Sequence, residues 1–410
     1  MLALAWANLV HNKVRTGLSV LAVGIGIMLM LISSGLAGGS IAEVAQRMQS
    51  VDAELVVLPA QENIIFTSGA PFPEIYRRYI EKQADDRGPL AAAVIPVFFG
   101  QVHMGGQQQR LFGVDPAQMG LFLGSRRVLE GRAFDRAHAF AQRIADGAPR
   151  PPSVDEAGIN AFLADGLELV IDDRLRRVGY YDEAAGRQVP YRIGDRIRVM
   201  GREFRIVGVV EAGVAGRVFA PLATLREIAL AGEKKSSMFF VKLRPDVDPV
   251  VAADRLAAAL GSAARVELKS AYGTLLRESF AQVNVYMNAS SGLALVVCFL
   301  FILLTMYTMV LERTRETGVL KALGVAGADL LRLSVIEALL IALAGVAAGI
   351  LIAFAAKWVL GVVRPLLTVE LTTGRLLLAA AVGVCGGALS ALYPGYRAAR
   401  LDPAEALSYE

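Results

Sequence analysis

The stretch GLALVVCFLFILLTMYTMVL at residues 292–311, followed directly by ERTRETGVLKALG at 312–324, decides the fold class of this chain. The first part contains no charged residue. A helix that rises 1.5 Å per residue needs about 20 apolar residues to cross the roughly 30 Å of bilayer hydrocarbon. We therefore expect a membrane-spanning helix over about 289–311 that ends where the charged segment begins.

Three more stretches have the length and hydropathy of a span. They lie at about 18–38, 333–358 and 376–393. The first is longer than the apolar core of a signal peptide, about 7–15 residues, so we expect it to be retained. Residues 51–273 have the composition of a globular domain. The fold class predicted is a membrane protein with four transmembrane α-helices plus a large α+β extracytoplasmic domain inserted between helices 1 and 2.

The overall composition agrees with this layout. The 410 residues are 55% hydrophobic and 20% charged, with 40 glycines and two cysteines, whereas soluble domains carry about 25% charge. Disordered, collagen-like, coiled-coil and disulfide-scaffold classes are excluded. The basic residues lie beside the spans or among acids, which argues against nucleic-acid binding.

Positive residues of short loops mark the cytoplasmic side of a membrane. They occur before the first span, between the second and third spans, and after the fourth, at Lys13, Arg15, Arg313, Arg315, Lys321, Arg332, Arg397 and Arg400. We expect both termini in the cytoplasm and the large domain outside, in the cytoplasmic (inner) membrane.

The large domain shows short β-like runs separated by turns. They lie at 55–58, 94–99, 111–114, 167–171, 197–200, 204–210 and 238–243, and helical patterns lie at 73–83, 224–231 and 250–260. Residues 197–210 read as a hairpin turning at Gly201-Arg202-Glu203, and 238–243 as an edge strand.

Two segments connect this domain to the spans. Residues 40–50 continue the first span as a polar–apolar helix. Residues 274–288, beginning at Thr274, carry apolar residues at spacings near three and four, at Leu275, Leu276, Phe280, Val283 and Met287. We interpret both as a helical stalk beyond the bilayer; the alternative is a pair of interfacial helices lying on the lipid.

Signatures of catalysis and of metal or nucleotide binding are missing from the sequence. It contains no P-loop, no H-E-x-x-H and no G-x-S-x-G, and its three histidines are far apart. Gly24-Ile25-Gly26 lies in an apolar span and indicates close helix packing. Glu337 is the one acid inside a span, for which a structural or coupling role is favoured over a proton relay. We expect no catalytic, metal or cofactor-binding residue in the chain.

Segment 312–324 reads as a short amphipathic helix with charges on one side and Leu320 and Leu323 on the other. Such a helix can dock in the groove of a partner, whereas a solvated loop would expose the two leucines. In the tail, Pro394 is expected to break or kink the fourth span.

These segments resemble the FtsX-like/MacB-like ABC transporter permease family. The resemblance rests on E-R-T-R-E-T-G-V-L-K-A-L-G at 312–324 with Ile336-Glu337-Ala338-Leu339-Leu340, on P-x-x-R-A-A-R-L-D-P-A-E-A-L at 394–407, and on Trp6-Ala7-Asn8-Leu9 before the first span. It covers about 1–50 and 275–410 firmly and the large domain more loosely. Thr317 departs from the isoleucine usual in the family.

The resemblance implies a permease subunit that dimerises and sits on a separate ABC ATPase, which would hold ATP and Mg. Carried over to this sequence, Glu312, Arg313, Arg315, Glu316, Leu320 and Leu323 would contact the ATPase, and Gly318 and Gly324 would shape the coupling helix. Residues 40–50 and 274–288 would form a stalk that passes movement to the outer domain. A second permease copy, identical or a close paralogue, and a periplasmic adaptor are further partners that the resemblance allows.

Within this reading the substrate stays open among lipoprotein release, macrolide or peptide efflux, other envelope export and control of a cell-wall hydrolase. One alternative is a membrane receptor that signals through the loop and has no ATPase partner. The other is an anchored envelope enzyme, which needs a catalytic constellation that the sequence lacks.

Overall fold

The computed structural model describes residues 2–11, 13–60, 72–134, 142, 163, 166–182, 186–312 and 314–400. Contacts divide the chain into two compact units. We call Met1–Ser40 with Ala281–Glu410 the helical unit, and Ile41–Phe280 the inserted unit. Each is described by itself.

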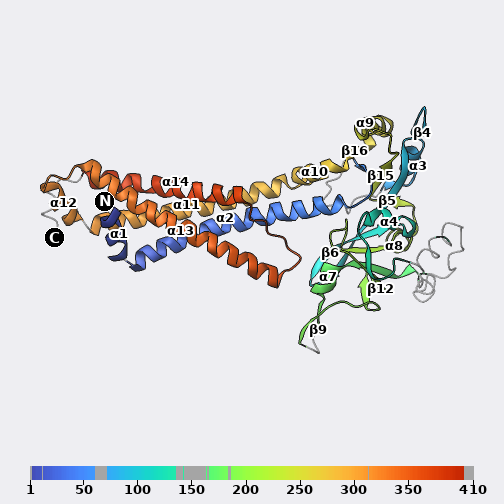
Figure 1. Cartoon of the computed structure of the whole chain (residues 1–410), viewed down its shortest axis with the longest axis horizontal. Coiled ribbons are helices and arrows are strands. Elements are labelled where there is room, and N and C mark those ends of the chain that lie inside the picture. Colours follow the sequence, from blue (N-terminus) through green and yellow to red (C-terminus); the bar gives the residue numbers. More distant parts are fainter. Residues whose placement is uncertain are drawn as a thin grey trace. The chain divides into compact units, whose positions relative to one another are not determined.

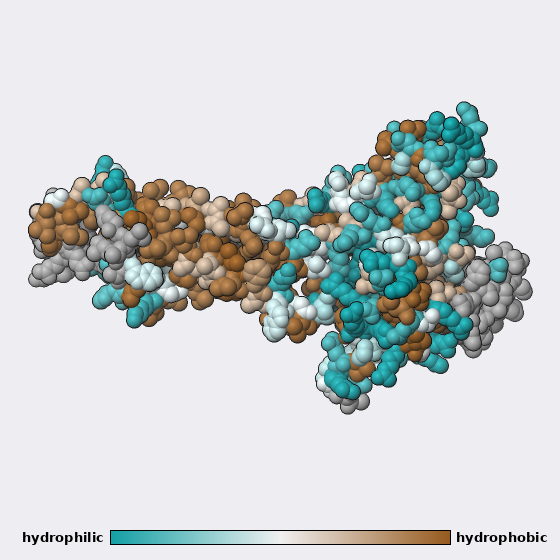
Figure 2. All heavy atoms as spheres, viewed as in Figure 1, coloured by the Kyte–Doolittle hydropathy of each residue, from teal (hydrophilic) through white to brown (hydrophobic). Residues whose placement is uncertain are grey.

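The described part of the helical unit contains four helices long and apolar enough to cross a membrane. They are α2 (Lys13–Met48), α11 (Ala281–Glu312), α13 (Gly327–Val363) and α14 (Thr373–Arg400), which run alongside one another (Figure 1). Hydrophobic residues cover the visible face of these helices, whereas hydrophilic residues gather on the inserted unit (Figure 2). Its described part also contains two short helices, α1 (Leu2–His11) and α12 (Thr314–Ala322). The predicted four-span layout is confirmed.

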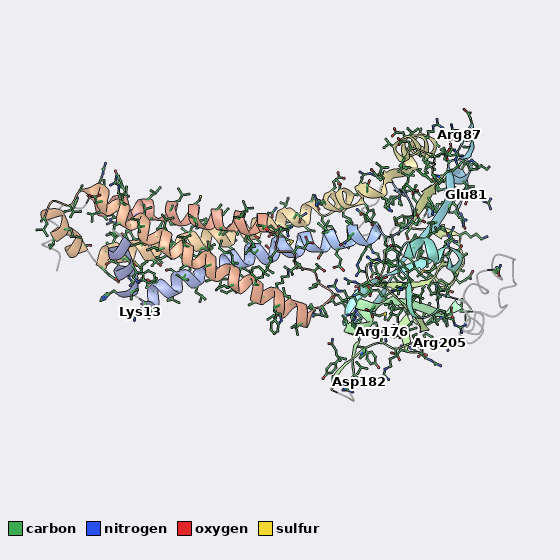
Figure 3. The ribbon with its side chains drawn as sticks, in the orientation of Figure 1. Lys13, Glu81, Arg87, Arg176, Asp182 and Arg205 are labelled. Carbon is green, nitrogen blue, oxygen red and sulfur yellow. The ribbon has the colours of Figure 1, made fainter. Side chains whose placement is uncertain are left out.

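All four helices are longer than the apolar stretches that predict them, because helical hydrogen bonding continues into the polar turns at their ends. Lys13, labelled in Figure 3, lies at the start of α2, and the other charged residues labelled there lie on the inserted unit. Pro394 does not break the fourth span: α14 continues through it to Arg400. Membrane helices tolerate the lost hydrogen bond when neighbouring groups cover the site, and Pro394 is buried.

Glycines allow α2 and α13 to approach closely. A Cβ on Gly349 would lie 2.7 Å from the carbonyl oxygen of Gly24, and one on Gly345 would lie 2.6 Å from the Val23 side chain. The hydroxyls of Ser19 and Thr305 hydrogen-bond at 2.7 Å between α2 and α11. The packing role expected for Gly24 is therefore confirmed, because membrane helices can approach this closely only where small residues lie at the contact.

The inserted unit is built on a sheet that has ten strands in the described part of the chain. Their order is β11 (Arg196–Val199), β12 (Arg202–Val210), β8 (Glu168–Asp172), β13 (Val218–Pro221), β6 (Gln107–Val114), β5 (Ala91–Met104), β15 (Met238–Leu243), β1 (Leu55–Pro59) and β16 (Ala264–Leu268), with β7 (Val128–Gly131) paired to β12. The pairs β12–β8 and β13–β6 are parallel. The predicted α+β class is confirmed.

Strand β15 corrects one expectation. The sequence pattern of 238–243 predicts an edge strand, but β15 pairs with β5 on one side and with β1 on the other. Five of its six residues are buried, which a central strand requires. Lys242 is the single polar residue of the strand, and it makes the sequence look like that of a strand with one face in water. In the structure its amine donates to Asp52.

The predicted hairpin joins β11 and β12 with a tighter turn than expected. Val199 pairs with Arg202, so the loop consists of Met200 and Gly201 alone. Both have positive φ, 47° and 81°. A two-residue hairpin loop of the type I′ class needs this conformation at both positions, and its twist matches that of the strands.

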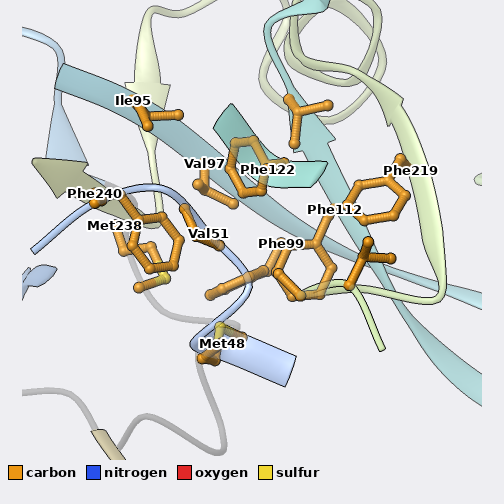
Figure 4. Packing of buried hydrophobic residues seen from close by; sticks show 14 of the residues in the cluster. Met48, Val51, Ile95, Val97, Phe99, Phe112, Phe122, Phe219, Met238 and Phe240 are labelled. Atoms are coloured by element: carbon orange, nitrogen blue, oxygen red, sulfur yellow. The ribbon is translucent and has the colours of Figure 1, made fainter. Parts of the chain in front are cut away.

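Two of the apolar clusters in the described part of the inserted unit lie against its sheet. One contains Ile80, Phe239, Leu256 and Leu260 and joins β1, β5 and β15 to the helices α3 (Ile75–Glu81) and α9 (Pro249–Leu260). The larger one contains Met48 and Val51 packed among phenylalanines of the sheet (Figure 4). Leu225 of α8 (Leu222–Leu230) is also fully buried in this unit.

The ends of the connecting helices belong to this larger cluster. Ile41 and Met48 of α2, and Tyr272, Leu275 and Leu276 of α10 (Tyr272–Ser279), are all buried in it. The units therefore divide at Ser40/Ile41 and Phe280/Ala281, whereas the sequence pattern predicts limits of the domain at 51 and 273. The sequence signal of a helix does not reveal which core its last turns join.

Candidate functional site

The predicted coupling segment forms α12, a helix of nine residues between α11 and α13. It ends in a glycine cap: Gly324 has φ of 93°, and the Val325 N–H donates to the Leu320 carbonyl at 3.1 Å. This bond spans five residues and satisfies a carbonyl that the helix leaves open, as in a Schellman motif. Gly324 is thus the residue that turns the chain from α12 toward α13.

An apolar side of this segment faces outward. Leu323 is 77% exposed, and Val319 and Leu320 are also exposed, whereas Gly318 is buried. Exposed leucines on a short helix beside charges suit docking to a partner better than solvation. Of the predicted contact residues, Arg313 and the side chains of Arg315 and Glu316 lie outside the described part of the chain.

Glu312 has a partner within the chain. Both carboxylate oxygens accept from the Arg15 guanidinium at 2.6 Å, which joins the start of α2 to the end of α11. The pair is exposed, with 36% and 50% of the two side chains accessible. Sequence reasoning assigned Glu312 to an ATPase contact and missed this bidentate pair.

Two further contacts fix the surroundings of α12. The Lys321 amine donates to the Ala399 carbonyl at 2.7 Å, which binds α12 to the last turn of α14. A Cβ on Gly327 would lie 2.9 Å from the same carbonyl oxygen. The end of α12 and the start of α13 therefore both lie against the last turn of α14.

Glu337 is buried in α13, and the Asn8 amide of α1 donates to its carboxylate at 2.6 Å. The N-terminal helix is thus docked on α13 by a hydrogen bond to a buried acid. This arrangement supports the structural role that the sequence favours for Glu337 over a proton relay.

The other end of α2 carries a charge cluster within the inserted unit. Glu43 accepts from the guanidinium groups of Arg47, Arg174 and Arg217 at 3.0, 3.1 and 2.7 Å. Arg47 also donates to Asp172 at 3.3 Å, and Asp172 is fully buried. The cluster joins the end of α2 to the end of β8, to α7 (Asp173–Val178) and to the segment before β13.

Asp172 has two roles in this cluster. It caps the N-terminus of α7 by accepting from the Leu175 N–H at 2.7 Å, and it is an ion-pair partner. Burial raises the pKa of Asp172, and the facing Arg47 opposes the rise. Burial likewise lowers the pKa of Arg217. Desolvation therefore exceeds attraction at both groups, as is common for buried ion pairs.

The predicted stalk residues do not form one continuous face. Leu276 is buried in the core of the inserted unit and Phe280 packs against that core, but Thr274 is exposed. Helix α10 ends at Ser279 and α11 begins at Ala281, so Phe280 separates them. Val283 is 42% exposed and Met287 is half-buried, both in α11.

Sequence reasoning missed Tyr272 and the cluster around Arg47. Tyr272 is buried, and burial raises its pKa to about 12, so its hydroxyl stays neutral. Glu43 and Arg47 lie four residues apart on a helix, which could have signalled an ion pair. Asp172 lies 125 residues away from Arg47, and no local pattern connects the two.

Among the described residues, no three His, Cys, Asp or Glu side chains gather as a metal site would require.

Two family profiles match the chain. The MacB-like periplasmic core domain matches residues 16–259, which is more than half of the sequence, and the FtsX-like permease C-terminal domain matches residues 288–403.

Individual relatives are distant. Macrolide export ATP-binding/permease protein MacB of Escherichia coli O157:H7 is 25% identical over 426 residues, covering 100% of this chain and 60% of that protein. MacB of Shewanella sp. (strain W3-18-1) is 28% identical over 268 residues, covering 62% of this chain and 40% of the relative. The chain thus spans about 60% of the length of the first of these.

Among solved structures, the periplasmic region of MacB from Actinobacillus actinomycetemcomitans matches at 12% identity with a TM-score of 0.36, covering 57% of this chain and 97% of that one. The profile matches follow the architecture described above: the first begins near the start of α2 and includes most of the inserted unit, and the second includes α12, α13 and α14. The chain therefore belongs to the MacB-like/FtsX-like family of ABC transporter permeases, with a MacB-like periplasmic core domain between its first two membrane helices.

Proposed function

We propose that the chain is the membrane subunit of an exporter, docks a separate ABC ATPase through α12, and transmits ATP-driven movement to the inserted unit. The observation that carries the proposal is the exposed apolar side formed by Val319 and Leu320 of α12 and by Leu323 directly after it. The sequence itself contains no P-loop, so ATP and Mg would be held by the partner.

The path of transmission runs along α2 in this proposal. Docking at α12 would move α11, which Arg15 joins to the start of α2 through Glu312. The far end of the same helix is held by Glu43 and Arg47 in the inserted unit.

The termini and α12 would lie in the cytoplasm and the inserted unit outside it, as the positive residues indicate. A second copy of the chain and a periplasmic adaptor would complete the assembly.

The test is co-purification of the full chain with a P-loop ATPase encoded beside its gene, followed by an assay of ATP hydrolysis. Leu323→Asp should reduce co-purification about tenfold or more, because a carboxylate would have to be desolvated in the apolar contact. Leu129→Asp is the matched control, since Leu129 is an exposed leucine of the inserted unit, 44% accessible.

Equal recovery of the ATPase with Leu323→Asp and with wild type would contradict docking through α12. A chain that binds no ATPase at all would favour the receptor reading instead.

A further inference from the structure

The inserted unit contains a polar pocket with a volume of about 450 Å³ beside the last turns of α2. Its walls come from the end of α2, from the turn after α4 (Met119–Leu123), from α7 and from the segment after β12. Eight of the ten lining residues are polar. Polar side chains at these positions can hold a hydrophilic ligand by hydrogen bonds.

The charges that line the pocket are predominantly positive. Arg47, Arg126 and Arg174 are among its lining residues, whereas Glu43 is the one acidic residue among them. Arg126 pairs with Glu211 at 3.1 Å and remains 40% exposed. A guanidinium has five N–H donors, so an arginine that pairs with one carboxylate oxygen can also donate to a second acceptor.

Two polar atoms of the lining residues are buried and lack a hydrogen-bond partner in the part of the chain that the structure describes. Arg47 is 7% exposed, and its Nη1 has no hydrogen-bond partner among the described residues. The Ser50 hydroxyl, one turn further on, is also buried without a partner there. Buried donors are normally satisfied, so such groups beside a pocket call for an explanation.

We propose that this pocket binds a phosphate-type oxyanion, either free or as the phosphate of a lipid headgroup. Guanidinium forks match the oxygens of phosphate, and the three arginines come from three separate segments. Free phosphate and a phosphate monoester present at least three acceptor oxygens, which can be reached from several directions at once, and the phosphodiester of a lipid headgroup presents two non-bridging oxygens. The volume leaves room for an organic part such as glycerol.

Binding would act on the end of α2. An oxyanion among Arg47, Arg126 and Arg174 would add contacts between α2, the turn after α4 and α7. The proposal stands on the geometry of the inserted unit and does not depend on docking at α12.

The experiment uses the full chain in a nonionic, phosphate-free detergent, titrated with inorganic phosphate, glycerol 3-phosphate or monomeric dihexanoyl phosphatidylglycerol. Calorimetry should show saturable binding of at least one probe. The Arg126→Gln/Arg174→Gln variant should bind it at least about tenfold more weakly. Arg187→Gln/Arg198→Gln removes the same charge at exposed positions of the inserted unit and should bind as wild type does.

Sodium chloride at matched ionic strength separates binding from screening of the arginines. Binding of the soluble phosphates would identify a free anion, and binding of the lipid alone would identify a headgroup site; either supports the proposal. The single variant Arg126→Gln changes only a half-exposed residue, so it should stay folded. Weaker binding by this variant would therefore not be caused by unfolding. Failure of all three probes to bind, or equal affinity in the double variant and its control, would overturn the proposal.

Discussion

The two ends of α2 carry ion pairs of opposite character. At its start, Arg15 meets Glu312 in good bidentate geometry, but both side chains are exposed. Near its end, Arg47 meets Glu43 and Asp172, and Asp172 has no accessible surface. Exposed pairs are worth about 0–1 kcal/mol, whereas removal of one partner from a buried pair costs about 3–5 kcal/mol. Environment and not geometry should therefore decide which pair stabilises the fold.

The largest effect is expected for Arg47→Leu. This change leaves the buried Asp172 without the arginine that hydrogen-bonds to it and should destabilise the inserted unit by about 3 kcal/mol. The measurement is thermal unfolding of the full chain in detergent. Arg77→Leu is the matched control, because Arg77 forms an i,i+4 pair with Glu81 on the surface of α3 and should cost under about 1 kcal/mol.

The pH dependence of Arg47→Leu sharpens the same prediction. The pKa of Asp172 is already raised by burial, and loss of Arg47 should raise it further. A raised pKa in the folded state favours folding when the group is protonated, and this contribution is lost as the pH rises through that pKa. The deficit of the variant relative to wild type should therefore shrink as the pH is lowered through the raised pKa of Asp172. A deficit that grows on acidification would contradict the account.

The comparison also shows what the sequence can and cannot predict. The four spans and the β11–β12 hairpin were predictable because each carries its own local signal, in hydropathy or in alternation ending at Gly201. The pairs Arg47–Asp172 and Asn8–Glu337 were not, because their partners lie 125 and 329 residues apart. The central place of β15 was missed for a related reason, since strand order depends on distant partners.

For the candidate site, the sequence indicates the short helix and the glycine that ends it. It does not indicate that Glu312 is paired within the chain, or that Lys321 reaches the Ala399 carbonyl. Charged residues beside a span look alike whether they contact a partner or a neighbouring helix. Their assignment requires the fold.

An intermediate effect is expected for the contact between Asn8 and Glu337. Asn8→Ala removes a hydrogen-bond donor to the buried Glu337 side chain and should cost about 1–2 kcal/mol, because the loss of a partner at a buried polar group is costly. Asn288→Ala, at an exposed position of α11, is the control.

A double-mutant cycle with Glu337→Gln isolates this contact. In the Glu337→Gln background, Asn8→Ala should cost less than it does in wild type, with a coupling of about 0.5–2 kcal/mol. Additive effects would show that the 2.6 Å contact contributes no stability.

The smallest effect is expected for Arg15→Gln, at the exposed end of the comparison. The loss should be at most about 1 kcal/mol and should shrink further in about 1 M salt, because exposed charges are screened. Arg332→Gln, which breaks an exposed pair with Asp329 on α13, is the control. A salt-independent loss as large as that of Arg47→Leu would mean that the Arg15–Glu312 pair is shielded from water in the membrane-embedded protein. In that case the exchange Arg15→Glu/Glu312→Arg should recover stability, since the pair would be restored with its charges reversed.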